Sequence, residues 1–499
     1  MPVKKKSTRR KPHPVKPPSP GEQKIVACWE DDPGDPKSQP PLAPITVSAP
    51  TPSATPLPFK ITGTAPAPQI YQPGTTEFLY YAAGCALRRT ADFWGGVLTK
   101  TTSWQIGKVL PVNLDSGVDL NAFYTRGGGG DSPGLHFFHD TVNGRTFFSG
   151  ESPDVTSHEM GHAVLDAIRP QLFNAQTIES AAFHEAFGDM SAMLSALQVT
   201  SFRQALLTET GGSLNRTSRL SRLAEQLGAA IRFLHPDAVD RDSLRNAANS
   251  FFYRDPQTLP PTAPAATLSS EPHSFSRVFS GAFLDALAGM FKTNGPATSD
   301  QLVKTSQDMA KILVGGVLEA PVVPDYYSQV AAHMISFGEG APFNGKYRDA
   351  LKSAFVRRGI LSLAAAATVT SMKRQAVRAM AATAAFTGGD ELPTAAISAA
   401  PYGLKSSGLK VYTAEEPKRL AVTSSSLTMG PVEPRSPQNA AESYTEDLFQ
   451  RGRVDVGTYA REDTGLVHPF GFKSHKVFEQ NGELVLKRIA FDCGFDHAE

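Results

Sequence analysis

The chain has 499 residues, of which 49 are basic and 48 acidic, so its formal net charge is +1. Such a balance argues against a protein that coats nucleic acid over its whole surface, and no nucleic-acid partner is expected. Hydrophobic residues make up 40% of the chain, which is enough for a packed core. The length allows about two to four domains.

The sequence contains no recognisable signal for export or for membrane insertion. It begins with the basic stretch MPVKKKSTRRKPHPVKPP, which is not followed by the apolar run of a secretory signal peptide. No stretch reaches about 18 consecutive apolar residues, so no membrane span is expected. The cysteines lie too far apart for a disulfide framework or a zinc ribbon: Cys28, Cys85 and Cys493. We expect a soluble protein with no classical export signal; the sequence leaves its compartment open between the cytoplasm and export by a non-classical route.

A high proline content distinguishes the first 75 residues from the rest of the chain. Eighteen of the 39 prolines lie before residue 74, and no acidic residue occurs before Glu22. A segment of this composition cannot bury enough apolar surface to offset the entropy lost on ordering. Residues 1–75 are therefore predicted to be a mostly disordered, proline-rich basic head.

Regular structure is predicted to begin at Thr76. TEFLYYAAGCALRRTADFWGGVL has apolar residues at helical spacing, and residues 100–150 have the Gly, Thr, Val and Phe content of short strands. From Val155 to about Leu361 the pattern is mostly helical. Residues 253–273 contain five prolines and are predicted to form a long loop, a feature that is often functional in a packed domain.

The last part of the chain, residues 364–499, is interpreted as a C-terminal extension. An alanine-rich helix to about Phe386 and a linker rich in Pro, Ser and Gly precede KVFEQNGELVLKRIAF, which predicts a hairpin turning at Asn481-Gly482. The histidines of this extension are interpreted as surface residues: His468, His475 and His497.

One segment carries the clearest chemistry, the HExxH motif of residues 158–162. His158 and His162 are four residues apart, so on a helix they lie on one face and can bind one metal ion together. Glu159 lies beside that face and can act on water bound to the metal. A hydrolytic zinc site needs three protein ligands and one open position.

The third ligand is predicted in ESAAFHEAFGD, on a second helix. Glu185 and Asp189 are four residues apart, so Glu185 can bind the ion while Asp189 accepts a hydrogen bond from the outer nitrogen of a liganding histidine. His184 and Glu179 are alternative ligands. Each would point about one helical step or more away from Asp189, and Glu185 is therefore preferred.

These segments resemble the thermolysin-like metallopeptidases of the gluzincin group, which includes the fungalysins. HEMGHAVLD and ESAAFHEAFGD are similar to the family's zinc helix and third-ligand helix. Three more segments resemble its substrate-binding edge strand, its Leu-Arg pair and the helix with its second catalytic histidine: Asn121–Tyr124, Leu244-Arg245 and His273–Phe283. The resemblance covers about residues 76–361.

The resemblance implies an α+β fold of two lobes. A β-rich N-terminal lobe with the HExxH helix would span residues 76–166, and a helical lobe would span residues 167–363. The two would meet at the active-site helix, with the disordered head before them and the C-terminal extension after them.

It also implies a zinc-dependent endopeptidase that acts on a peptide or protein substrate. Glu159 would be the general base and His273 would stabilise the oxyanion. Asn121 and the main chain of Ala122 would hold the substrate as an added strand, and Arg245 would bind a substrate carbonyl and brace the site.

The sequence departs from the family pattern at three places. The family's tyrosine about nine residues before the third ligand is Gln176 here, whose amide can donate a hydrogen bond to the oxyanion but cannot act as a phenol. The acid before the second histidine is replaced by Leu268, although Glu271 is close. Residues 190–196 contain no acid, so the sequence gives little support for the family's calcium site.

Two other functions remain open from the sequence. An aminopeptidase of the gluzincin group would need an acidic anchor for the substrate amine, as in a GxMEN-like segment, and none is present. A non-catalytic binding protein stabilised by zinc would explain the missing tyrosine and the long extensions. A purely structural site, however, does not need Glu159.

Overall fold

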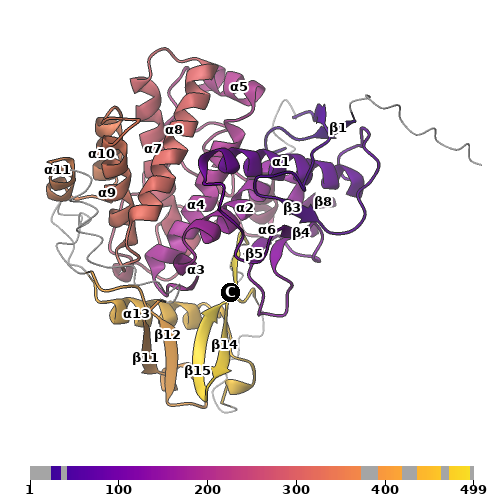
Figure 1. Cartoon of the computed structure of the whole chain (residues 1–499). Coiled ribbons are helices and arrows are strands. Elements are labelled where there is room, and N and C mark those ends of the chain that lie inside the picture. Colours follow the sequence, from indigo (N-terminus) through magenta and orange to yellow (C-terminus); the bar gives the residue numbers. More distant parts are fainter. Residues whose placement is uncertain (1–23, 35–41, 372–391, 418–434, 462–470, 495–499) are drawn as a thin grey trace, which may run out of the picture.

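The computed structural model describes residues 24–34, 42–371, 392–417, 435–461 and 471–494. These residues form an α+β protein in which helices and strands are largely segregated (Figure 1). None of the described helices combines the length and the apolar character that crossing a bilayer requires.

The main sheet has five strands in the order β16-β5-β6-β4-β3. Strands β3, β4 and β6 run parallel, whereas β5 is antiparallel to both of its neighbours, β6 and β16. The bounds are β3 (Phe59–Ile61), β4 (Leu110–Asn113), β5 (Ala122–Thr125), β6 (Gly134–Phe137) and β16 (Ala490–Asp492). The sheet therefore joins both ends of the chain, and β5 is not the free edge strand that the sequence predicted.

Helix α1 (Thr76–Val97) covers this sheet and matches the predicted helix. Thr75 caps it by accepting a hydrogen bond from the amide of Phe78. Its buried residues Leu79, Ala83 and Leu87 recur every four positions, as one face of a helix requires, and belong to the same apolar core as the strands. The next strands form the predicted β-rich region, including the hairpin of β7 (His139–Val142) and β8 (Arg145–Phe148).

The prediction of a disordered head is wrong for residues 24–34 and 42–75; residues 1–23 and 35–41 lie outside the described part. Strands β1 (Ile25–Cys28) and β2 (Ile45–Ser48) pair with each other and pack on α1 through Trp29. Asp32 accepts hydrogen bonds from the amides of Gly34 and Gln226. Apolar contacts to the rest of the protein, which a local composition argument cannot include, provide the stabilisation that the head lacks by itself.

The region after residue 153 is mostly helical, as predicted. Helix α4 (Ile178–Ala196) packs between α2 (Pro153–Ile168) and α7 (Pro272–Thr293) at the centre of the molecule. The others are α3 (Gln171–Asn174), α5 (Thr200–Thr210), α6 (Glu225–Leu234), α8 (Ser299–Glu319), α9 (Tyr326–Glu339), α10 (Arg348–Arg357) and α11 (Leu363–Ser371). Short strands β9 (Arg222–Leu223) and β10 (Arg245–Asn246) form a separate pair.

The C-terminal extension forms a second five-stranded sheet, in the order β11-β12-β15-β14-β13, beside α13 (Pro437–Gln450). Its strands are β11 (Thr394–Ser398), β12 (Gly408–Tyr412), β13 (Val454–Asp455), β14 (His475–Gln480) and β15 (Glu483–Arg488). The predicted hairpin is confirmed, because Asn481 and Gly482 both adopt positive φ between β14 and β15. The predicted linker is wrong where β11 and β12 lie.

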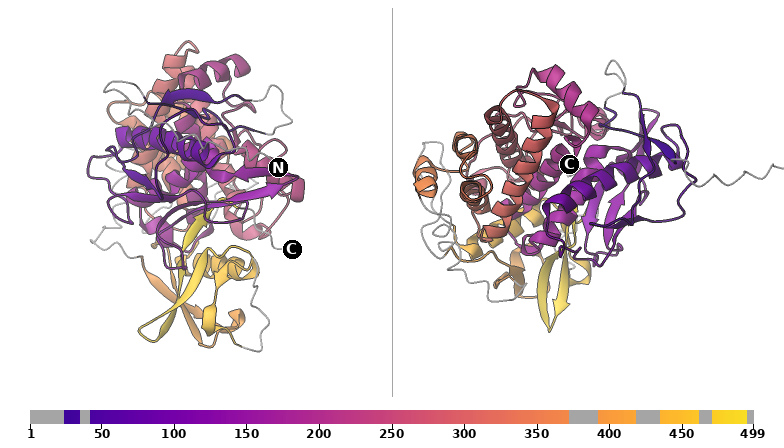
Figure 2. Two further views of the ribbon diagram at one scale, coloured as in Figure 1. Left: turned by 90° about the vertical axis from the view of Figure 1, so that its right-hand side faces the viewer. Right: turned by 45° about the horizontal axis from the view of Figure 1, so that its top comes forward.

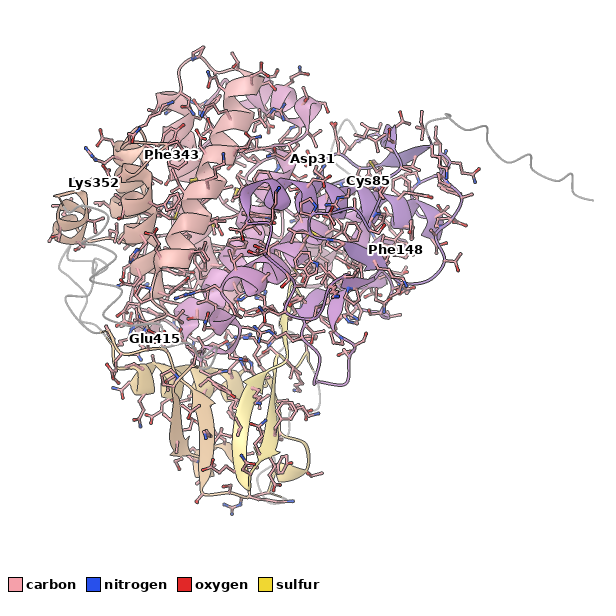
Figure 3. All side chains as sticks on the ribbon, viewed as in Figure 1. Asp31, Cys85, Phe148, Phe343, Lys352 and Glu415 are labelled. Atoms are coloured by element: carbon pink, nitrogen blue, oxygen red, sulfur yellow. The ribbon has the colours of Figure 1, made fainter. Side chains whose placement is uncertain are left out.

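This second sheet lies at one end of the molecule, below the helices in Figure 1 (Figures 1 and 2). The chain then leaves it after β15, and β16 pairs with β5 of the main sheet. The amide of Glu415 donates to the main-chain oxygen of Val322 at this boundary (Figure 3). His475 is fully buried in β14, so its prediction as a surface residue is wrong. His468 and His497 lie outside the described residues. So does the part of the predicted alanine-rich helix that follows Ser371.

Candidate metal centre

The centre forms where α2 crosses α4 at unusually close range. A Cβ added to Gly161 would lie 3.0 Å from the Cα of Gly188, and a Cβ added to Gly188 would lie 2.5 Å from the ring of His158. The two glycines therefore allow the helix backbones to approach each other. This approach places the HExxH face of α2 against Glu185 on α4.

The predicted ligand atoms converge there. Glu185 Oε2 lies 3.3 Å from His158 Nε2 and 3.8 Å from His162 Nε2, and one ligand atom from each residue lies within 4.8 Å of the others. In a tetrahedral zinc site with bonds of about 2 Å, ligand atoms are roughly 3.3 Å apart, so the spacing suits one small ion.

These atoms are poorly paired by the protein itself. Within the described part of the chain, His158 Nε2 and His162 Nε2 are buried and have no hydrogen-bond partner. Glu185 Oε2 is also buried and makes no hydrogen bond of good geometry, although His273 Nε2 lies 3.2 Å from it. Leaving a polar atom buried and unpaired costs about 1–3 kcal/mol. A cation bound by all three would remove that cost, and the donor set of two imidazoles and a carboxylate is one that zinc accepts.

Asp189 lies on the outer side of His158, as predicted. Its Oδ1 is 3.2 Å from His158 Nδ1 and accepts a hydrogen bond from Arg245 Nη2 at 3.0 Å, while Ser280 donates to Oδ2. Burial opposes ionisation, but Arg245 and His158 lower the pKa of Asp189 to about 2. A carboxylate in this place fixes the imidazole with Nε2 directed to the metal position.

Glu159 is completely buried, and the Cys493 thiol lies beside its carboxyl group as a hydrogen-bond donor. Burial raises its pKa to about 8, although the nearby His158 and the Cys493 thiol oppose that shift. A buried carboxyl group whose pKa is raised toward neutrality beside a metal position has the character of a general base.

His273 faces Glu185 from the start of α7. Its Nε2 is 3.2 Å from Glu185 Oε2, and its Nδ1 is 2.7 Å from Glu271 Oε1. Burial lowers the pKa of His273, but Glu185 and Glu271 outweigh it and raise the pKa well above its ordinary value. Glu271 thus supplies the acid beside the histidine that Leu268 cannot.

The two alternative ligands lie outside the cluster. The ring of His184 stacks on Phe491, with centroids 4.0 Å apart, and its Nδ1 is 3.3 Å from Nδ1 of His162, on the side away from the unpartnered Nε2. Glu179 accepts hydrogen bonds from the Tyr253 hydroxyl at 2.6 Å and from Arg435 Nη2 at 2.9 Å.

The predicted substrate-binding residues do not all lie at the cluster. Ala122 and Asn121 contact the C-terminal segment, Arg245 lies beside the metal ligands, and Gln176 lies apart from them. The main-chain oxygen of Ala122 accepts a hydrogen bond from the amide of Cys493 at 2.8 Å, and the Asn121 side chain lies against Gly494. Arg245 lies beside the metal ligands, where its side chain donates to Asp189 and its Nη2 is 3.3 Å from His158 Nδ1. The Gln176 amide instead donates to the main-chain oxygen of Asn174, and none of its hydrogen bonds among the described residues reaches the cluster.

Three residues near the centre were missed from the sequence: Phe491, Asp492 and Cys493. Cys493 offers a sulfur within 4.8 Å of ligand atoms of both His158 and Glu159, which makes a second candidate metal-binding group. No local motif marks this segment, because it reaches the site only through its pairing with a strand more than 300 residues earlier.

A cavity of about 540 Å³ continues from the centre. Arg245, His273, Cys493 and Gly494 line it together with Thr262 to Ala265 of the proline-rich loop, whereas His158, His162 and Glu185 are not among its lining residues. The predicted loop therefore borders the candidate site. The volume suits several residues of an extended peptide or a small molecule.

No protein-family model matches this chain, and no curated protein is significantly similar to it.

Proposed function

We propose that this protein is a zinc-dependent endopeptidase. The observation that carries the proposal is the convergence of three buried ligand atoms of His158, His162 and Glu185, none of which makes a hydrogen bond of good geometry, beside the buried carboxyl group of Glu159. A purely structural zinc site has four protein ligands and no adjacent free carboxyl group. The arrangement supports a hydrolytic site.

A zinc ion held by these residues supplies Lewis acidity, which lowers the pKa of water and polarises a substrate carbonyl. Glu159 accepts the proton of the attacking water and later delivers it to the leaving amine. Since Glu159 is buried and makes no hydrogen bond to a nitrogen or oxygen of the described residues, its carboxylate can serve this proton transfer.

His273 stabilises the oxyanion. Its Nε2 donates to the main-chain oxygen of Asp492 at 2.5 Å. It can therefore reach a main-chain oxygen of a substrate peptide that lies along β5. The interactions with Glu185 and Glu271 favour the protonated ring, which is the better donor. Ala122 and Asn121 hold the substrate as a strand antiparallel to β5.

Two roles differ from the sequence expectation. Arg245 acts mainly through Asp189, which orients His158, and Gln176 is left out of the oxyanion site. The main sheet, whose strands β4, β5 and β6 lie within residues 76–166, adjoins the helices of residues 167–363 at α2. We propose that these two parts correspond to the two lobes of a thermolysin-like enzyme, with β3 and β16 added to the first.

The test is digestion of a peptide library by the full chain, with zinc and after chelation, followed by mass spectrometry of the products. Cys493→Ser is assayed beside the natural chain because the thiol lies next to Glu159. Internal cuts that need zinc are expected. Release of single residues only from free N-termini would favour an aminopeptidase. Stoichiometric zinc without cleavage by either protein would favour a non-catalytic binding protein.

A further inference from the structure

The chain's own C-terminal segment occupies the place that the proposed function assigns to a substrate. β16 pairs with β5 in an antiparallel register in which Ala490, Phe491 and Asp492 face Thr125, Tyr124 and Phe123. The amide of the following Cys493 donates to Ala122. This is the main-chain geometry expected of a bound peptide.

Two side chains anchor this segment to its surroundings. The Phe491 ring stacks on His184 and lies 5.1 Å from the ring of His162, and the Arg488 guanidinium lies over the Phe491 ring, 4.0 Å from its centroid. The Asp492 carboxylate pairs with Arg453 in the C-terminal sheet region. The segment therefore combines a substrate-like backbone with attachments to the second sheet, from which it emerges directly after β15 (Figure 2).

The backbone contacts continue to the catalytic side chains. The main-chain oxygen of Asp492 accepts the hydrogen bond from His273, and so occupies the donor that the proposed reaction needs. The next residue, Cys493, is 2% exposed, and its sulfur lies beside His158 and Glu159. That is the side of the centre at which Glu159 would act on water.

We propose that Cys493 is the fourth ligand of the metal ion and that β16 keeps the enzyme latent. The inference rests on the proposed function. Cysteine thiolate is a preferred zinc ligand, and the three-ligand centre leaves one position for it. The group of Cys493 and the three-ligand group share His158 but are otherwise separate, so metal binding has to draw the sulfur toward His162 and Glu185. On binding, the thiol releases its proton to solvent. When β16 leaves β5, that position, Ala122 and His273 all become available to a substrate.

A simpler role for β16 would be to cover the edge of the sheet, as many proteins cover exposed strands. That role requires the pairing with β5 but no sulfur next to the metal ligands. The two roles therefore differ in what a metal probe would detect at Cys493.

Cobalt(II) substitution of the full chain separates them. The natural chain should bind one equivalent of cobalt and show thiolate-to-cobalt charge-transfer absorption in the near ultraviolet. Cys493→Ser should retain the cobalt and lose that absorption. Cys85→Ser is the matched control, because Cys85 is a partly buried thiol in α1 outside both candidate metal groups, and it should keep the absorption.

Bound cobalt without the charge-transfer absorption, or absorption that persists in Cys493→Ser, would overturn the role of Cys493 and leave the metal centre intact. Failure to bind cobalt, with His158→Ala behaving like the natural chain, would overturn the proposed function as well. The spectroscopic result does not depend on activity, so the two failures are distinguishable.

Peptidase activity gives the second measurement. Cys493→Ser should cleave a fluorogenic peptide at least about tenfold faster than the natural chain, which corresponds to about 1.4 kcal/mol. Phe491→Ala keeps the thiol but weakens the packing of β16, and it should also raise the rate. Zinc-replete, folded Cys493→Ser that cleaves no faster than the natural chain, when the peptide is cleaved by both, would contradict latency.

Discussion

Arg245 donates a hydrogen bond to Asp189 at 3.0 Å, and Asp189 in turn lies 3.2 Å from the outer nitrogen of His158. All three side chains are buried. The series runs from the guanidinium of Arg245 through the carboxylate of Asp189 to the imidazole of His158, whose Nε2 faces the candidate metal position. It keeps Asp189 ionised and gives the imidazole its orientation.

We expect Asp189→Asn to weaken zinc binding by about 10- to 100-fold, because an amide orients His158 less well and does not offset the charge of Arg245. Competition with a chromophoric chelator measures the affinity. Asp166→Asn is the matched control: Asp166 is buried in α2 and accepts from Tyr124 and Arg126, away from the cluster. It should keep the parent affinity, and equal losses in both variants would indicate general destabilisation.

The general base should be separable from the metal ligands. Glu159→Gln removes the proton acceptor but no ligand, so kcat/KM should fall by about 10²- to 10⁴-fold while zinc remains stoichiometric. His158→Ala should instead lose the metal. Steady-state kinetics and metal analysis on the same preparations check both. A Glu159→Gln variant with parent activity would remove this residue from the mechanism.

The close approach of α2 and α4 should depend on Gly188. Its substitution by Ala places a methyl group 2.5 Å from the His158 ring, so the ring must move, and both zinc affinity and melting temperature should fall. Gly96→Ala in α1 meets nothing within 4 Å. That control should leave zinc affinity unchanged and add about 0.5–1 kcal/mol of stability. Unchanged zinc binding in Gly188→Ala would show that α4 adjusts freely.

The metal cluster could be predicted from the sequence because its determinants are local. His158 and His162 are one helical turn apart, and Glu185 and Asp189 are one turn apart on a second helix, so each pair needs only helical geometry to share a face. The confirmed hairpin at Asn481-Gly482 is local in the same sense. The close packing of α2 on α4 through Gly161 and Gly188 could not be predicted from the spacing of residues in the sequence.

The parts that escaped prediction depend on distant contacts. Pairing of β16 with β5 follows from no period in the sequence, and it converts an expected edge strand at Asn121–Tyr124 into an internal one. The head is ordered in residues 24–34 and 42–75 because it packs on α1 and the start of α2. His475 is buried because a strand beside it completes the second sheet. In each case the stabilising surface lies far along the chain.

The last prediction concerns Arg435, which joins the C-terminal extension to the helices. It lies 2.9 Å from Glu179 and 2.9 Å from Asp325. Burial raises the pKa of Glu179 to about 7, above the ordinary 4.5, although Arg435 opposes the shift. The folded state therefore binds this proton more tightly than the unfolded state, and the stability that the group contributes falls as pH rises from about 4.5 through 7.

Arg435→Met should leave Glu179 as a buried carboxylate without a counter-ion at pH 8, held only by neutral donors such as Tyr253, and lower the free energy of unfolding by about 3–5 kcal/mol. At pH 5 the carboxyl group is protonated, so the loss should be smaller. Urea unfolding of parent and variant at both pH values measures the difference. Arg348→Met breaks a pair with Glu339 in which the arginine is 46% exposed, and should cost no more than about 1 kcal/mol at either pH. An Arg435→Met loss that is equal at pH 5 and 8 would show that lost packing dominates and that the charge of Glu179 is immaterial.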